Sequence, residues 1–275
     1  MTKAVRMMQE NIKLIDLMIE LIDARIPLSS RNPDIDGLAG DKARLIVLNK
    51  ADLADRAANL EWTEYFNELG LSAIALDSRS TGGMKLVNGR IQEVCRDKIE
   101  KDRKRGILNR PIRAMVAGIP NVGKSTFINS LAGKAIAKTG NKPGVTKGKQ
   151  WIRLNRNVEL LDTPGILWPK FDDRKVGLHL AMIGSINDDI LDGEEIAREL
   201  IDLIRSIKTG VLCERYKLDS ENGASFELLE RIALSRGCLI KGGQPDIGKA
   251  ADILIDDFRS GRLAAISLER APLKG

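Results

Sequence analysis

The sequence is poor in the residues that build metal centres and disulfide frameworks. It contains one histidine, His179, and three cysteines, Cys95, Cys213 and Cys238, among 275 residues. A single histidine excludes a histidine-based metal cluster. Three widely spaced cysteines are typical of free thiols in a reducing compartment. We therefore expect neither a zinc site nor a disulfide, and we expect a cytoplasmic protein.

Long apolar runs are also missing. No run approaches the ~20 residues that a membrane-spanning helix needs. Charged residues are dispersed through positions 1–20, a pattern that excludes a signal or transit peptide. The sequence has neither a lipidation motif nor an amphipathic anchor, which disfavours a role in membrane traffic or signalling. We expect no membrane partner.

The net charge of +6 is unevenly distributed. Lys85–Arg113 contains ten basic and four acidic residues, and Lys134–Arg156 contains seven basic residues and no acidic one. Val176–Gly275 has 13 basic and 17 acidic residues. Clustered positive charge of this kind favours a polyanionic partner larger than a nucleotide. For either stretch alone, a solvated helix face remains an equal alternative.

Short apolar runs alternate with amphipathic stretches over the first two-thirds of the chain, which predicts an α/β doubly wound, mostly parallel sheet. The expected strands are Leu17–Asp23, Arg44–Leu48, Ala73–Leu76, Ile112–Ala117 and Val158–Leu161, with Trp151–Leu154 paired to the last. The expected helices are Asp55–Glu68, Met84–Lys104 and Lys124–Leu131.

The strand pattern ends near Lys175. Apolar residues at helical spacing then predict helices over Glu194–Ile207, Phe226–Leu234 and Ile247–Phe258, with Gly237 and Gly261 as stops. We therefore expect a nucleotide-binding domain over residues 1–175 and a small all-helical domain over residues 176–275. A monomer is the default expectation.

The segment Gly118–Ser125 fits the phosphate-loop pattern G-x-x-x-x-G-K-[ST]. It lies between the expected strand Ile112–Ala117 and a helix, as the motif requires. Lys124 is expected to bridge the β- and γ-phosphates, and the Ser125 hydroxyl to bind Mg²⁺. The predicted phosphate-binding residues are Asn121, Val122, Gly123, Lys124, Ser125 and Thr126.

The string Asn49-Lys50-Ala51-Asp52 fits the guanine-reading pattern N-K-x-D and follows an apolar strand. The Asp52 carboxylate can accept hydrogen bonds from the ring N–H and the exocyclic amine of guanine. Adenine lacks that donor pair, so the motif selects GTP over ATP. The stem of Lys50 is expected to lie on the base. Asp77 and Ser78 are placed to touch the base edge, although an ordinary turn is equally open there.

The string Asp162-Thr163-Pro164-Gly165 fits the D-x-x-G pattern. Asp162 is expected to hold Mg²⁺ through water, and the Gly165 N–H to meet the γ-phosphate. Thr146 is the candidate switch threonine that joins Mg²⁺ only when the γ-phosphate is present.

The order of these motifs is the reverse of the usual one, because the base-reading string comes before the phosphate loop. This order predicts a circularly permuted P-loop GTPase, with the splice near Arg105–Pro111. Ile166 stands where a Ras-like enzyme has a water-positioning glutamine. Asn121 is the residue type that many glutamine-lacking GTPases use to bind K⁺. We therefore assign catalytic roles to Lys124, Thr146 and Asn121, and expect slow, K⁺-sensitive turnover that a partner raises.

The sequence resembles the bacterial YlqF/RbgA ribosome-biogenesis GTPases. The resemblance rests on the permuted motif order and on three segments: DARIPLSSRNP at 23–33, DTPGILWPK at 162–170 and RGCL at 236–239. It implies a GTPase that binds the immature large (50S) ribosomal subunit late in assembly and is stimulated by it. The partners implied are ribosomal RNA and ribosomal proteins, not DNA. A different class of function remains open, namely an RNA-binding assembly scaffold in which GTP is mainly a structural ligand.

One departure from the family pattern concerns hydrolysis. The family usually begins with an aromatic-Pro-Gly-His-Met segment whose histidine is proposed to assist hydrolysis, whereas this sequence begins Met1-Thr2-Lys3-Ala4. We therefore expect impaired stimulated hydrolysis. His179 lies beyond the D-x-x-G string, and we interpret it as an ordinary side chain at the domain junction.

Overall fold

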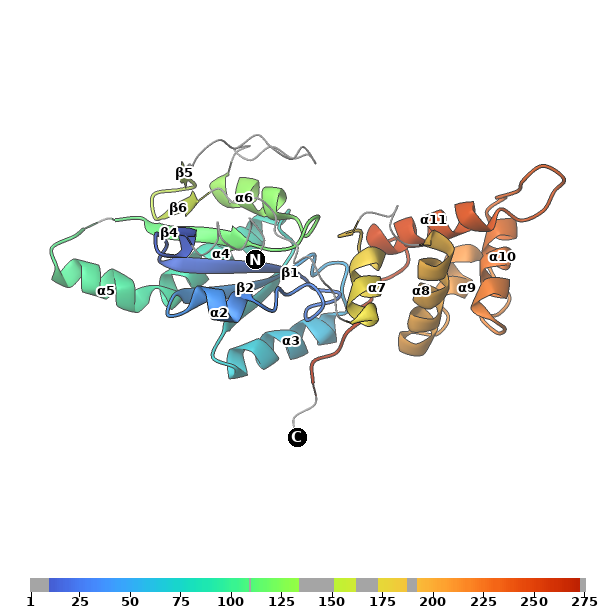
Figure 1. The fold of residues 1–275 in the computed structure, drawn as a ribbon, viewed down its shortest axis with the longest axis horizontal. Helices are drawn as coiled ribbons and strands as arrows, with labels where there is room; N and C mark the ends of the chain where they lie inside the picture. Colours follow the sequence, from blue (N-terminus) through green and yellow to red (C-terminus); the bar gives the residue numbers. More distant parts are fainter. Residues whose placement is uncertain (1–9, 109, 134–150, 162–172, 187–191, 273–275) are drawn as a thin grey trace.

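A computed structural model of the protein describes residues 10–108, 110–133, 151–161, 173–186 and 192–272. Within these ranges the strands form one sheet in the order β3-β2-β1-β4-β6-β5 (Figure 1). The strands are β1 (Leu17–Asp23), β2 (Ala43–Asn49), β3 (Ser72–Leu76), β4 (Ile112–Ala117), β5 (Trp151–Arg153) and β6 (Val158–Leu161). All neighbouring strands are parallel except β5, which pairs antiparallel with β6.

The sheet is buried on both faces, as a doubly wound fold requires. Along β1, Leu17, Ile19 and Leu21 share a core cluster with residues of α4 (Thr81–Val94) and α6 (Lys124–Ala132). The alternate residues face the other way, where α2 (Ile35–Ala39) and α3 (Arg56–Glu68) supply the partners. Trp62 of α3 is fully buried on that side. The predicted α/β sheet is confirmed.

One expected helix is two helices. The continuous helix predicted over Met84–Lys104 is instead α4 followed by α5 (Arg96–Lys104), and Cys95 lies between them with φ −96° and ψ 10°. The apolar spacing Ile91, Cys95, Ile99 continues through the break, so periodicity could not reveal it. The first helix buries three side chains against the sheet, whereas charged α5 extends beyond the sheet (Figure 1).

A bundle of helices follows the sheet. Its elements are α7 (Arg174–Met182), α8 (Gly193–Ile207), α9 (Val211–Tyr216), α10 (Ser225–Ser235) and α11 (Ile247–Arg259). The expected stops Gly237 and Gly261 have φ values of 64° and 75°, the left-handed conformation that glycine adopts without strain. The domain boundary proposed at residue 175 falls inside α7, which the sequence did not predict. No helix in the described ranges is both long and apolar enough to cross a bilayer.

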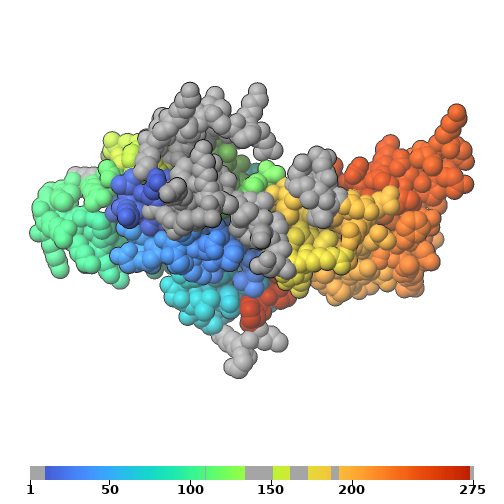
Figure 2. Space-filling model, in the orientation of Figure 1, coloured from blue at the N-terminus to red at the C-terminus, as the bar shows by residue number. Residues whose placement is uncertain are grey.

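The chain returns to the sheet domain after α11. The Ile266 N–H donates to the Leu53 carbonyl at 3.0 Å, and the Leu268 N–H donates to the Arg25 carbonyl at 2.8 Å. Trp62 Nε1 donates to the Glu269 carbonyl at 3.3 Å. The returning segment therefore runs along α3 and the loop after β1 (Figure 1). The space-filling view shows the two domains side by side in an elongated molecule (Figure 2).

Candidate functional site

The parallel strands β1, β2, β3 and β4 end at one edge of the sheet, and the predicted motifs begin there. The phosphate loop connects β4 to α6. A Cβ added at Gly118 would lie 2.5 Å from the Leu21 carbonyl oxygen, so only glycine fits at this approach to β1. Gly123 is the N-cap of α6 with φ 101°. Loop and helix N-terminus together form the backbone cradle that a phosphate group requires.

Asn49 ties three loops together from the end of β2. Its Nδ2 donates to the Val122 carbonyl of the phosphate loop at 2.7 Å. Its Oδ1 accepts from the Ser78 N–H at 3.0 Å and from the Ser78 hydroxyl at 2.6 Å. The side chain is 2% exposed, so these bonds form away from water. Two motifs that are far apart in sequence are thus neighbours in the fold.

Lys50 extends from the base-reading string to the phosphate loop. Its Nζ donates to the Asn121 carbonyl at 2.9 Å and lies 3.1 Å from Asp23 Oδ2 at the end of β1. Both Lys50 and Asn121 have φ 57°, which is uncommon for residues with a side chain. Such backbone conformations gather at functional sites, where surrounding contacts hold them.

The carboxylate of Asp52 is paired with an arginine that the sequence analysis did not single out. Arg79 Nη2 lies 2.6 Å from Asp52 Oδ2, and Arg79 Nε lies 2.9 Å from Asp77 Oδ1. One guanidinium therefore joins the two carboxylates that were predicted to read the base. Ala51 donates its N–H to the Leu76 carbonyl at 3.1 Å, which fixes the string against β3.

Lys124 folds back over its own loop. Its Nζ donates to the Gly118 carbonyl at 2.9 Å and to the Ile119 carbonyl at 2.6 Å. Burial lowers the pKa of this ammonium to about 8. Ser125 and Thr126 occupy the first turn of α6 beside it.

Asn121 links the phosphate loop to the helical domain. Its Nδ2 donates to the Gly184 carbonyl at 2.7 Å, and the Ser185 hydroxyl donates to the Pro120 carbonyl at 2.9 Å. The remaining predicted residues, Thr146, Asp162 and Gly165, lie outside the described residues, as does Ile166. The structure therefore brings together the base-reading string, Ser78 and the phosphate loop.

His179 lies at the junction of the two domains, where it was expected. Its Nδ1 is 3.0 Å from Ser29 Oγ and 3.0 Å from Glu269 Oε1. The ring is buried, and its Nε2 has no hydrogen-bond partner. These contacts join α7, the loop after β1 and the returning C-terminal segment, a structural arrangement.

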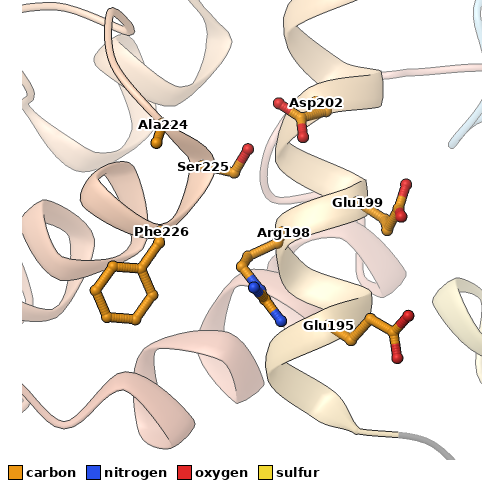
Figure 3. A pocket seen from close by; sticks show the side chains of 7 residues that line it. All are labelled: Glu195, Arg198, Glu199, Asp202, Ala224, Ser225 and Phe226. Carbon is orange, nitrogen blue, oxygen red and sulfur yellow. The ribbon is translucent and has the colours of Figure 1, made fainter.

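A groove of about 400 Å³ opens between α8 and α10 in the helical domain (Figure 3). Its lining includes Glu195, Arg198 and the exposed ring of Phe226. Glu195 and Glu199 are ion-paired to Arg174. The groove contains none of the motif residues, so it is separate from the site at the sheet edge.

Two site residues, Arg79 and Asp23, were not predicted from the sequence. Arg79 follows Asp77 and Ser78, and its only signal is a cation beside two carboxylates. Asp23 is an acid that ends an apolar strand, between two strands, β2 and β4, that also end in motifs. That position, together with the unexplained DAR run at residues 23–25, was the available signal.

The residues present fit a guanine nucleotide with Mg²⁺. The glycine cradle suits phosphate oxygens, and the hydroxyl of Ser125 is the hard oxygen donor that Mg²⁺ prefers. Among the described residues, no group of three or more His, Cys, Asp or Glu side chains is placed to hold a metal ion.

Comparisons with known proteins agree with this geometry. Residues 113–210 match the family model described as 50S ribosome-binding GTPase. The chain is 46% identical to Ribosome biogenesis GTPase A of Bacillus cereus over 98% of its length and 91% of the relative. It is 32% identical to the protein of that name from Thermotoga maritima, over 98% and 91% of the two chains.

Solved structures give the same result. The crystal structure of GNP-bound YlqF from Thermotoga maritima matches with a TM-score of 0.70 and 27% identity, covering 98% of each chain. A GDP-bound structure of that protein matches with a TM-score of 0.70 and 26% identity, over 96% of this chain and 99% of the other. The chain therefore belongs to the ribosome biogenesis GTPase A (RbgA/YlqF) family and is a circularly permuted GTPase.

Proposed function

We propose that this GTPase is an assembly factor for the large (50S) ribosomal subunit, that it binds ribosomal RNA in the GTP state, and that hydrolysis releases it. The observation that carries the nucleotide part is the set of Asn49 hydrogen bonds to Val122 and Ser78. They hold the base-reading string directly beside the phosphate loop, as the binding of one nucleotide by both would require. Family membership supports the ribosomal part.

Within this proposal each residue has a defined role. Asn49, Lys50, Ala51 and Asp52 hold the guanine, with Asp77 and Ser78 at its edge. Arg79 bonds Asp52 Oδ2, so the base and the guanidinium would share that oxygen. Lys124 leaves the Gly118 and Ile119 carbonyls for the β- and γ-phosphates. Residues 121–126 and Gly165 supply donors to the phosphates.

Mg²⁺ would be held by Ser125, Thr146 and Asp162, and when bound it neutralises charge that develops between the phosphates. We further propose that Asn121 contributes to a K⁺ site that serves in place of an arginine finger. The Asn121 Nδ2 donates to the Gly184 carbonyl in this structure, and its Oδ1 is the atom that would bind K⁺.

The charge distribution supports an RNA partner. On α5 and the turn after it, Arg96, Lys101, Arg103, Lys104 and Arg105 are all exposed. This basic surface extends from the end of the molecule opposite the helical domain (Figure 1). Contacts to phosphates would dominate such binding and make it sensitive to salt.

GTPase activity with and without purified large subunits, in K⁺ and in Na⁺, tests the proposal. We expect subunits to raise turnover in K⁺, and cosedimentation with subunits to require a non-hydrolysable GTP analogue. Replacing Arg103, Lys104 and Arg105 by glutamate should abolish cosedimentation while leaving basal hydrolysis unchanged. A GTPase rate that is the same with and without subunits would refute the proposed partner. Equal rates in K⁺ and Na⁺ would refute the proposed role of K⁺.

The scaffold alternative differs in the consequence of hydrolysis. Lys124→Ala should prevent GTP binding, whereas a variant that binds but cannot hydrolyse GTP should remain on the subunit if hydrolysis drives release. If that variant leaves the subunit at the wild-type rate, GTP is a structural ligand and the scaffold function holds.

A further inference from the structure

The buried pair formed by Asp23 and Arg25 lies outside the nucleotide-binding motifs, although Asp23 contacts Lys50. Asp23 is fully buried and Arg25 is 1% exposed. Arg25 Nε donates to Asp23 Oδ1 at 2.9 Å, and Nη2 donates to Asp23 Oδ2 at 2.8 Å. Removing two charges from water costs about as much as their attraction returns, so a buried pair is weak evidence for a stabilising role. Its other contacts indicate what it does.

On one side the pair holds Lys50. Asp23 Oδ2 lies 3.1 Å from Lys50 Nζ, and that ammonium also donates to the Asn121 carbonyl. Burial alone would raise the pKa of the Asp23 carboxyl, but the adjacent Arg25 and Lys50 cations outweigh it and hold the pKa well below its usual range. Asp23 is therefore an anion that fixes the head of Lys50 between β1 and the phosphate loop.

On the other side the pair holds the end of α11. Arg25 Nη1 donates to the Phe258 carbonyl at 3.3 Å and to the Arg259 carbonyl at 3.4 Å. Its guanidinium lies 5.1 Å from the centre of the Phe258 ring. The last carbonyls of a helix lack partners within the helix and favour a cation. Arg25 thus joins the helical domain to Asp23.

The helical domain also reaches the phosphate loop directly. Arg259 donates to the carbonyls of Met182 and Ala181, next to Gly184 and Ser185. Gly184 and Ser185 bond Asn121 and Pro120 as described above. The contacts form a closed circuit from α11 through Arg25, Asp23 and Lys50 to Asn121, and back to the helical domain at Gly184.

We propose that Asp23 and Arg25 are positioning residues for Lys50, and that through them guanine-nucleotide binding is coupled to the seating of α11. This rests on the proposed role of Lys50 beneath the base. A movement of α11 that displaces Arg25 would shift Asp23 and weaken its contact with Lys50. The affinity for the nucleotide would change as a result. Since coupling between two sites is reciprocal, the bound nucleotide changes the preferred position of the helical domain by the same factor.

A double-mutant cycle tests this coupling. Arg25→Lys keeps the charge, but a lysine cannot bond both Asp23 oxygens and the α11 carbonyls together. Dissociation of fluorescent GDP is measured for wild type, Arg25→Lys, Lys50→Ala and the double variant. We expect Arg25→Lys to speed dissociation roughly tenfold in the wild-type background, the loss of one charge-assisted hydrogen bond. In the Lys50→Ala background we expect less than about twofold, because residues that act through one another are not additive.

The matched control is Arg44→Lys. Arg44 also bonds a buried carboxylate of β1, with Nη2 3.1 Å from Glu20 Oε2 and Nη1 2.6 Å from Asp36 Oδ1, but it contacts neither Lys50 nor α11 through these bonds. It should leave GDP dissociation unchanged. If Arg25→Lys does not fold, Phe258→Leu replaces it, with an expected acceleration of roughly threefold for the lost cation–π contact.

The outcomes separate this inference from the proposed function. If wild type does not bind GDP, or Lys50→Ala binds it as tightly as wild type, the proposed nucleotide site fails and the coupling falls with it. If both behave as expected, but Arg25→Lys acts equally with and without Lys50 or matches Arg44→Lys, the coupling alone is overturned.

Discussion

Replacing Asn49 by alanine should lower both the stability of the protein and its affinity for nucleotide. The change leaves the Val122 carbonyl and the Ser78 N–H without partners at a position that is 2% exposed. A buried polar group without a partner costs about 1–3 kcal/mol, so two such groups predict a loss of about 3 kcal/mol in the free energy of unfolding. For a chain of this size the melting temperature should fall by roughly 5 °C.

The affinity for GDP should fall at least about tenfold, because the base-reading and phosphate loops lose their mutual placement. Urea unfolding and titration with fluorescent GDP measure the two effects separately. Ser78→Ala removes only the hydrogen bond of the hydroxyl and should lower the free energy of unfolding by about 1 kcal/mol.

The matched control is Asn155→Ala, since Asn155 also makes three hydrogen bonds, to Asn88, Asn157 and Val158, in the β5–β6 turn. It should lower stability modestly and leave GDP affinity unchanged. A loss below about 1 kcal/mol for Asn49→Ala, or an affinity no worse than that of Asn155→Ala, would refute the reasoning.

Three further predictions concern the described residues. Burial lowers the pKa of Lys124 to about 8, and a bound phosphate should restore its charge. GDP binding should therefore take up roughly 0.5 proton at pH 8 and 0.9 at pH 9, and the affinity for GDP should fall as the pH rises above 8. Calorimetric binding enthalpies that do not vary with the ionisation enthalpy of the buffer would contradict this. Gly118→Ala should lower the free energy of unfolding by about 1–3 kcal/mol, because its Cβ would clash with the Leu21 carbonyl. The control Gly89→Ala in α4 would place its Cβ where nothing lies within 4 Å, so thermal unfolding should show a neutral or stabilising effect. Burial raises the pKa of the Cys95 thiol to about 12, so iodoacetamide at pH 8 should modify Cys95 only after unfolding in urea. Mass spectrometry of proteolytic peptides, which distinguishes Cys95 from the half-exposed Cys213, detects any earlier reaction.

Much of the sheet was predictable because parallel strands buried on both faces appear as plain apolar runs. Leu17–Asp23, Ile112–Ala117 and Val158–Leu161 match the observed strands residue for residue. The adjacency of Asn49 and the phosphate loop followed from the motifs, since the carboxyl ends of neighbouring parallel strands meet at one edge.

Contacts set by tertiary packing were not predictable. The short helices α2, α7 and α9 have too few turns to establish a periodicity. Arg79 pairs with Asp52, and Arg25 donates to the Phe258 carbonyl. These residues are distant in sequence and come into contact only after the chain has folded. No local pattern marks such pairs, and the sequence offered only the DAR run as an unexplained segment.

The return of the chain from α11 to α3 makes the helical domain an insert that is anchored at both of its ends. A domain on one linker can swivel freely, whereas two attachments that lie side by side, with Arg259 bonded to the Met182 and Ala181 carbonyls, leave chiefly a rocking movement about the line between them. Such a movement would swing the far helices α9 and α10 through the widest arc while the ends of α7 and α11 travel little. The geometry of attachment thus converts a small displacement beside the phosphate loop into a large one at the tip.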